Sequence, residues 1–129
     1  MAEKTVVRTE NAPAPFQGAP YSQAVRYGDL LFVAGQVALR PGHDAIEGDT
    51  IEEQTEVVCE NLKAILEAAG SSFEQVLNTT IYLIDFDDFA KLNEVYGRYV
   101  GASPPARATI QIAALPMGAR VEIAVVAHV

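Results

Sequence analysis

The fold is decided first by the stretch TIEEQTEVVCENLKAILEAAG, residues 50–70. Its apolar residues recur at helical spacing, so they would share one face of an α-helix. They are Ile51, Val58, Leu62, Ile65, Leu66 and Ala69. Thr50 and Glu53 have the spacing of a capping box, and Gly70 suits the residue that follows a helix. The pattern predicts an amphipathic helix over residues 51–69.

Strands are predicted on both sides of this helix. Residues 21–27 and 30–37 precede it, with Gly28 and Asp29 suited to a tight hairpin turn between them. Three further segments have strand composition or alternation, namely residues 76–84, 106–113 and 121–129. The segment 115–118, LPMG, reads as the turn between the last two.

A second helix is predicted after residue 84, capped by Asp85 or Asp87. Its apolar stripe consists of Phe89, Leu92, Tyr96 and Tyr99, and Ser103-Pro104-Pro105 ends it. The predicted order is therefore β-β-α-β-α-β-β, an α+β fold. We expect a single domain over residues 1–129, with residues 1–20 forming an irregular arm because residues 11–20 hold three prolines.

The predicted sheet is apolar on both faces. Two helices cover one face, yet neighbouring strand residues such as Leu30 to Val33 point alternately to both sides. No third helix is predicted to cover the other face. Self-association is therefore expected, without a subunit number following from this step.

The length and charge of the chain argue against several classes of partner and location. The chain has 129 residues with 9 basic and 17 acidic side chains, a formal net charge of −8. A nucleic-acid partner is disfavoured because such surfaces are rich in Lys and Arg. No apolar run approaches the roughly 18–20 residues of a membrane span. The first eight residues lack the apolar core of a secretory signal, and one cysteine excludes an internal disulfide. A cytoplasmic location is expected.

Few side chains are candidates for chemistry. His43 and His128 are far apart in the chain, so no metal site is predicted, and Cys59 reads as a packed thiol. Arg107 and Glu122 stand out, because Glu122 is a carboxylate in an otherwise apolar strand and Arg107 alternates with Thr109 on one strand face. The alternative for each is a charge at a sheet edge that discourages aggregation.

Several motifs, in order along nearly the whole chain, resemble the RidA/YjgF family of imine deaminases. They are Asn11-Ala12-Pro13, PYSQAV at 20–25, AGQ at 34–36, NLKAILEAAG at 61–70, DFA at 88–90 with Asn93 and Tyr96, PAR at 105–107, LP at 115–116 and VEI at 121–123. The resemblance implies a chorismate-mutase-like domain that forms a homotrimer, with the sheets making a central barrel and three sites in clefts between subunits. It also implies hydrolysis of 2-imino acids, tautomers of enamines released by PLP-dependent enzymes, to 2-oxo acids and ammonia, without metal or cofactor.

Family site residues match Tyr21, Gly35, Asn93, Arg107, Thr109 and Glu122. Ala34 stands where many members have Ser, and Thr109 stands where some have Cys, which bears on substrate preference more than on reaction class. Arg107 is suited to grip the substrate carboxylate with two parallel hydrogen bonds. Glu122 is suited to orient water or accept its proton, and Tyr21 to cover the ligand.

A register estimate suggests that the site is shared between subunits. If the last two strands form a hairpin turning at residues 117–118, Arg107 and Glu122 lie some 20 Å apart along the ladder. One chain would then be unable to hold both on one small substrate, whereas a neighbouring subunit would bring them together. A non-adjacent pairing of the two strands would weaken this inference.

Two other functions compete with the deaminase. One is a non-catalytic trimer that binds small carboxylates in the same cleft, which needs Arg107 but not Glu122. The other is a ribonuclease or translation inhibitor, which the charge of −8 disfavours.

Overall fold

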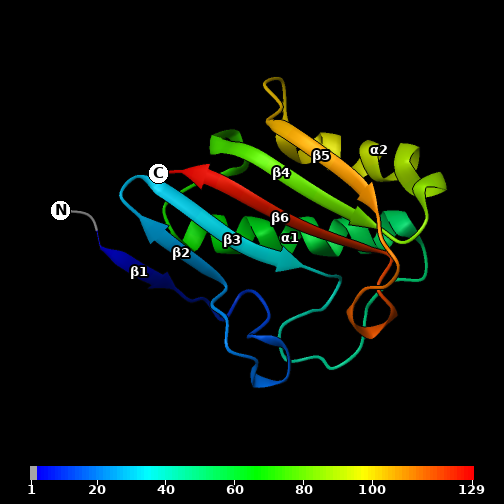
Figure 1. The fold of residues 1–129 in the computed structure, drawn as a ribbon, viewed down its shortest axis with the longest axis horizontal. Coiled ribbons are helices and arrows are strands. Elements are labelled where there is room, and N and C mark those ends of the chain that lie inside the picture. The colour runs from blue at the N-terminus through cyan, green and yellow to red at the C-terminus, as the bar shows by residue number, and fades with distance from the viewer. Residues whose placement is uncertain (1–2) are drawn as a thin grey trace.

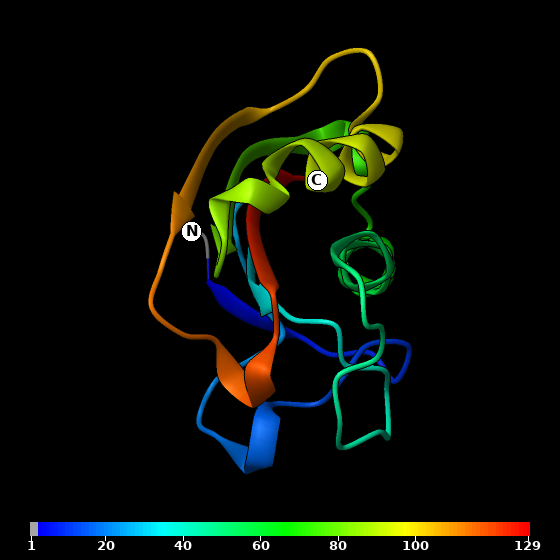
Figure 2. The ribbon, with the colours of Figure 1, turned by 90° about the vertical axis from the view of Figure 1, so that its right-hand side faces the viewer.

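A computed structural model describes residues 3–129 of the chain. Over these residues it has one six-stranded sheet and two α-helices, which lie on the same side of the sheet (Figures 1 and 2). The strands are β1 Lys4–Val7, β2 Ala24–Tyr27, β3 Leu30–Gln36, β4 Val76–Leu83, β5 Ala106–Gln111 and β6 Val121–His128. The helices are α1 Ile51–Ala68 and α2 Phe89–Val100. Neither helix combines the length and hydropathy needed to span a bilayer.

The strand order is β1-β2-β3-β6-β4-β5. β4 and β5 pair in parallel across the α2 crossover, and the other neighbouring strands are antiparallel. The last two strands therefore form no hairpin, because β6 lies between β3 and β4 while β5 is an edge strand (Figure 1). Burial explains this placement: Val121, Ile123, Val125 and Ala127 are all buried, so β6 gains most in the centre of the sheet.

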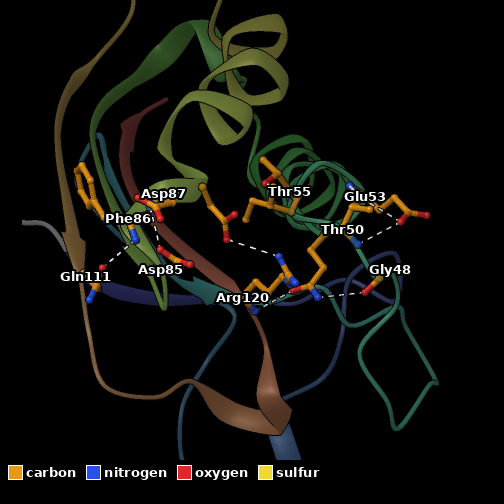
Figure 3. Close-up of polar contacts among 12 residues, drawn as sticks. Gly48, Thr50, Glu53, Thr55, Asp85, Phe86, Asp87, Gln111 and Arg120 are labelled. Carbon is orange, nitrogen blue, oxygen red and sulfur yellow. Dashed lines mark hydrogen bonds and ion pairs between the residues drawn. The ribbon is translucent and has the colours of Figure 1, made fainter.

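Helix α1 begins as the sequence predicts. Thr50 Oγ1 accepts a hydrogen bond from the Glu53 N–H at 3.1 Å, and Glu53 Oε1 accepts one from the Thr50 N–H at 3.1 Å (Figure 3). This capping box satisfies N–H groups that the first turn cannot pair internally. The helix ends at Ala68, and Gly70 follows with a φ of +80°. Its buried face packs on Leu31 and Val33 of β3 and on the inward residues of β6.

Two predicted segments differ in detail. Residues 4–7, which were expected to be part of an irregular arm, form β1 and pair with β2, while residues 1–2 lie outside the described residues. Asp85 accepts a hydrogen bond from the Asp87 N–H at 2.9 Å, so it caps a short 3-10 turn over Phe86–Asp88 that leads into α2 (Figure 3). Neither Asp85 nor Asp87 caps α2 as predicted, because the 3-10 turn intervenes and Asp88 takes the N-cap position without a side-chain cap bond. β1 adds backbone pairing to a segment whose composition alone does not identify a strand.

The sheet face away from the helices remains apolar and exposed in a single chain. Tyr27, Leu30, Phe32 and Ile110 keep 54%, 40%, 48% and 44% of their surfaces accessible. Leu30 and Phe32 alternate with the buried Leu31 and Val33, which face the helices. This is the uncovered face that the two-sided hydrophobicity of the strands predicted.

Candidate functional site

A cavity of about 300 Å³ opens beside the end of β6 that carries Glu122. We call it the Glu122 pocket. Most of its walls are apolar, and its further lining residues are Pro13, Ala14, Phe16, Ala19, Tyr21, Ala34, Gly35, Gln36, Val37, Leu39, Pro116 and Met117. Four of the predicted site residues, Tyr21, Ala34, Gly35 and Glu122, thus line one pocket. A carboxylate in such a wall can act on a small ligand shielded from bulk water.

A β-bulge in β3 brings Gly35 against Glu122. Val33 pairs with Val125 and Gln36 pairs with Ile123. The two residues between them on β3, Ala34 and Gly35, therefore lie opposite a single residue of β6. A Cβ at residue 35 would lie only 2.7 Å from Glu122 Cδ and 3.0 Å from Glu122 Cγ. Glycine at 35 is therefore required for the carboxylate to occupy its present place.

Burial controls the acidity of Glu122. Its side chain is partly buried, and removal of the carboxylate from water raises its pKa above the usual range. Among residues 3–129, none of the hydrogen bonds engages this carboxylate, so nothing counters the desolvation. A raised pKa strengthens the group as a proton acceptor once it is ionised, which suits a general base or a water-orienting group.

Tyr21 lines the Glu122 pocket and is partly exposed. Its hydroxyl oxygen accepts the Phe16 backbone N–H at 2.6 Å, and 44% of the residue remains exposed. The bond fixes the oxygen and leaves the hydroxyl proton available to donate to a ligand. Ala34 contributes a methyl group to the wall and no hydrogen-bonding side chain.

Arg107, Asn93 and Thr109 form a second group, which we call the Arg107 cluster. The Arg107 guanidinium carbon lies 5.4 Å from the ring centroid of Phe89 and 5.3 Å from that of Tyr96, both on α2. Asn93 Oδ1 and Thr109 Oγ1 are buried, and neither finds a hydrogen-bond partner among residues 3–129. Buried polar atoms are nearly always paired. An unpaired amide oxygen on α2 and an unpaired hydroxyl on β5, the two elements that also carry Arg107 and its aromatic contacts, therefore make this a candidate site for a polar ligand.

The Glu122 pocket and the Arg107 cluster lie on opposite faces of the sheet. Arg107 packs against α2, whereas Glu122 alternates with Val121 and Ile123, whose side chains are buried beneath the helices. Arg107 aligns with Thr79 of β4, and Glu122 aligns with Tyr82. Three residues along β4 and two strand spacings across separate their Cα atoms by about 14 Å.

The separation of about 14 Å between Arg107 and Glu122 is shorter than the roughly 20 Å expected from a hairpin of the last two strands. The hairpin register was wrong because β4 lies between β5 and β6. The two groups are closer than that register implied, yet they point away from each other. One chain therefore does not bring Arg107 and Glu122 together around a small molecule.

Three buried amide side chains hold neighbouring backbone segments, and those of Gln23 and Asn61 bond residues that line the pocket. Gln23 Nε2 donates to the carbonyl oxygens of Thr9, Ala12 and Pro13, and Gln23 Oε1 accepts the Thr9 N–H at 2.8 Å. Asn61 Nδ2 donates to the Leu39 carbonyl at 2.7 Å. Gln54 Nε2 donates to the Gly48 carbonyl at 3.0 Å, and its Oε1 accepts the Arg120 N–H at 2.9 Å (Figure 3). These residues stand out because their polar side chains are buried, and one sequence alone does not show which polar side chains are buried.

Other candidate residues carry no site. Within residues 3–129, no three His, Cys, Asp or Glu side chains are close enough to hold a metal ion. Cys59 is buried in α1, and burial raises the pKa of its thiol.

Comparison with known proteins gives consistent matches over nearly the whole chain. The model of the family described as Endoribonuclease L-PSP matches residues 9–129. A RutC family protein of Pyrococcus horikoshii is 48% identical over 125 residues, covering 97% of this chain and 98% of the relative. The 2-iminobutanoate/2-iminopropanoate deaminase of Mus musculus is 42% identical over 124 residues, covering 96% and 90%. The crystal structure of E. coli TdcF with bound serine is 34% identical, with a TM-score of 0.89 and coverage of 97% and 98%.

Proposed function

Because this chain belongs to the RidA/YjgF family, we propose that it hydrolyses reactive 2-imino acids to 2-oxo acids and ammonia in the cytoplasm. We further propose that it acts as a homotrimer. Each site would combine the Arg107 cluster of one copy with the Glu122 pocket of its neighbour. Some relatives carry the name of such a deaminase, whereas others are named only by family.

The observation that carries this proposal is the separation of two incomplete half-sites. The Arg107 cluster has a cation and two unpaired buried oxygens, and the Glu122 pocket has a desolvated carboxylate. Each lacks what the other holds. The exposed apolar sheet face supplies a reason for copies to associate, because burial of Phe32 and Ile110 is favourable.

The proposed reaction needs an anchor and a proton acceptor. The Arg107 guanidinium holds the substrate carboxylate through two parallel hydrogen bonds, which places the adjacent imine carbon. Water adds to that carbon as Glu122 accepts its proton. Glu122 returns this proton to the imine nitrogen, so the carbon then bears a hydroxyl and an amine. Glu122 next moves the hydroxyl proton to the same nitrogen. The carbon–nitrogen bond breaks, the carbon–oxygen double bond forms, and ammonia leaves with the 2-oxo acid. The serine bound to the E. coli protein has the same carboxylate next to a nitrogen-bearing carbon.

Two alternatives are less well supported. A ribonuclease would follow the family description, but the net charge of −8 opposes binding of a polyanion. A carboxylate-binding module would use Arg107 and leave Glu122 idle. Glu122→Gln separates this from the enzyme, because it should abolish turnover and preserve ligand binding.

Subunit mixing tests the shared site. Arg107→Ala and Glu122→Gln are each expected to abolish release of 2-oxo acid from enzymatically generated 2-iminopropanoate and 2-iminobutanoate. The two inactive proteins are then unfolded together, refolded at equal amounts and assayed. In a closed ring, random assembly gives about one intact site in four, so about a quarter of wild-type activity should return. Each protein refolded alone is the control. No recovery in a mixture shown to exchange subunits would refute the shared site.

A further inference from the structure

The guanidinium of Arg107 is held by aromatic rings and not by an acid. Within residues 3–129, none of the ion pairs includes Arg107, although acidic residues outnumber basic ones in this chain. Phe89 and Tyr96 each lie about one helical turn from Asn93 in α2, on opposite sides of it along the helix. At this spacing their rings share the face that meets β5. Both rings lie within the distance at which a cation is attracted to a π-face.

Tyr96 is itself fixed by strand β4. Its hydroxyl donates to Thr79 Oγ1 at 2.9 Å, and both residues are buried. Thr79 is the register partner of Arg107 in the parallel β4–β5 pair. The strand that positions the backbone of Arg107 therefore also positions one of the rings under its side chain. Phe89 is supported by Phe86, whose ring stacks on it at 4.9 Å between centroids.

This arrangement has a consequence for anion binding. A carboxylate partner would orient the guanidinium but would also neutralise it and occupy its N–H groups. Aromatic rings orient the same group while leaving its charge and its N–H donors free. The difference matters here because a chain with a net charge of −8 repels an anionic ligand at a distance.

We propose that Phe89 and Tyr96 are positioning residues that hold the Arg107 guanidinium ready for the substrate carboxylate without competing for it. The inference rests on the proposed role of Arg107 as carboxylate anchor, and it does not depend on the chemistry at Glu122. Loss of either ring frees the arginine side chain, which must then be ordered when the ligand binds.

The test measures binding of a stable product, 2-oxobutanoate, to the intact protein by calorimetry, with 2-oxobutanamide as the neutral analogue. Phe89→Leu and Tyr96→Leu should each raise the Kd for 2-oxobutanoate on the order of tenfold, with a much smaller change for the amide. Phe89→Tyr, which keeps an aromatic ring at residue 89, should bind 2-oxobutanoate within about twofold of wild type. Tyr99→Leu is the matched control, since Tyr99 lies on α2 and packs on Phe73, away from Arg107.

The outcomes separate this inference from the proposed reaction. Equal weakening of both ligands, or unchanged binding in Phe89→Leu and Tyr96→Leu, would overturn the positioning role. A wild-type protein that binds neither ligand would overturn it as well. If wild type binds 2-oxobutanoate and both variants lose selectivity, the inference stands even where no imine is hydrolysed, and only the proposed reaction fails. Where Tyr96→Leu does not fold, Phe89→Leu with its Tyr rescue decides.

Discussion

Gly35→Ala should damage the site while leaving the fold nearly intact. The backbone of Gly35 lies outside the left-handed region, so alanine is free to adopt it without strain. The new Cβ would meet Glu122 Cδ at 2.7 Å, whereas carbon atoms in contact settle near 3.5–4.0 Å. The carboxylate must therefore move by about 1 Å, and it is able to do so because it ends a flexible side chain.

The expected stability change is small. A side chain forced away from its preferred rotamer costs about 1 kcal/mol, and replacement of glycine by alanine at a compatible position returns up to about 1 kcal/mol. The free energy of unfolding, measured by urea denaturation, should remain within about 1 kcal/mol of wild type. A displacement of about 1 Å at a catalytic group, by contrast, is expected to lower kcat on the order of a hundredfold.

The assay compares release of 2-oxo acid from 2-iminopropanoate in a double-mutant cycle with Glu122→Ala. Once Glu122 is truncated, alanine at residue 35 has no carboxylate to displace. It should therefore not lower whatever rate Glu122→Ala retains above the uncatalysed reaction. Full activity in Gly35→Ala would refute the assigned contact. So would a loss of activity in Gly35→Ala that is equally large in the Glu122→Ala background.

Further predictions address the arm, the helix cap and pH. Gln23→Ala removes hydrogen bonds that hold residues 9–13, so unfolding free energy should fall by about 3 kcal/mol and limited proteolysis should cut near Pro13. Thr50→Ala should cost about 1 kcal/mol, and Thr50→Ser should restore it. Because the pKa of Glu122 is raised, kcat should fall with decreasing pH from a higher pH than an ordinary glutamate gives. The raised pKa of Glu122 also affects stability, because the unfolded chain loses the Glu122 proton at a lower pH than the folded protein does. The free energy of unfolding therefore falls as pH rises from the unfolded-state pKa to the folded-state pKa of Glu122. Glu122→Gln should therefore be more stable than wild type at pH 7 and equal to it at pH 3 by thermal melting.

Local signals in the sequence predicted the elements whose causes are local. The capping box at Thr50, the glycine at 70 and the alternation of residues 121–127 each depend on neighbours within a few positions. The strand order depends on which segments pair over long distances, and turn residues at 116–118 do not report that β6 pairs with β3 and β4. A compact turn is compatible with a hairpin and with a crossover to the sheet centre.

The residues of the candidate site were predictable from the sequence, whereas their arrangement in space was not. Glu122 was identified as a lone charge in an apolar strand, and Arg107 was identified by its alternation with Thr109 on one strand face. The family resemblance supplied Tyr21, Gly35 and Asn93. The bulge at Gly35 and the rings under Arg107 arise from register and helix packing, which spacing along one chain does not encode. The opposite orientation of the two groups follows from strand parity once the neighbours of β5 and β6 are known.

Thr109 gives the Arg107 cluster a hydroxyl and no thiol. The chain's single cysteine, Cys59, lies in the core of α1 with its pKa raised by burial, so it stays protonated and shielded. Neither the pocket nor the cluster therefore offers a thiol to an alkylating agent. Native protein should resist iodoacetamide, and labelling of Cys59 becomes a direct report of unfolding.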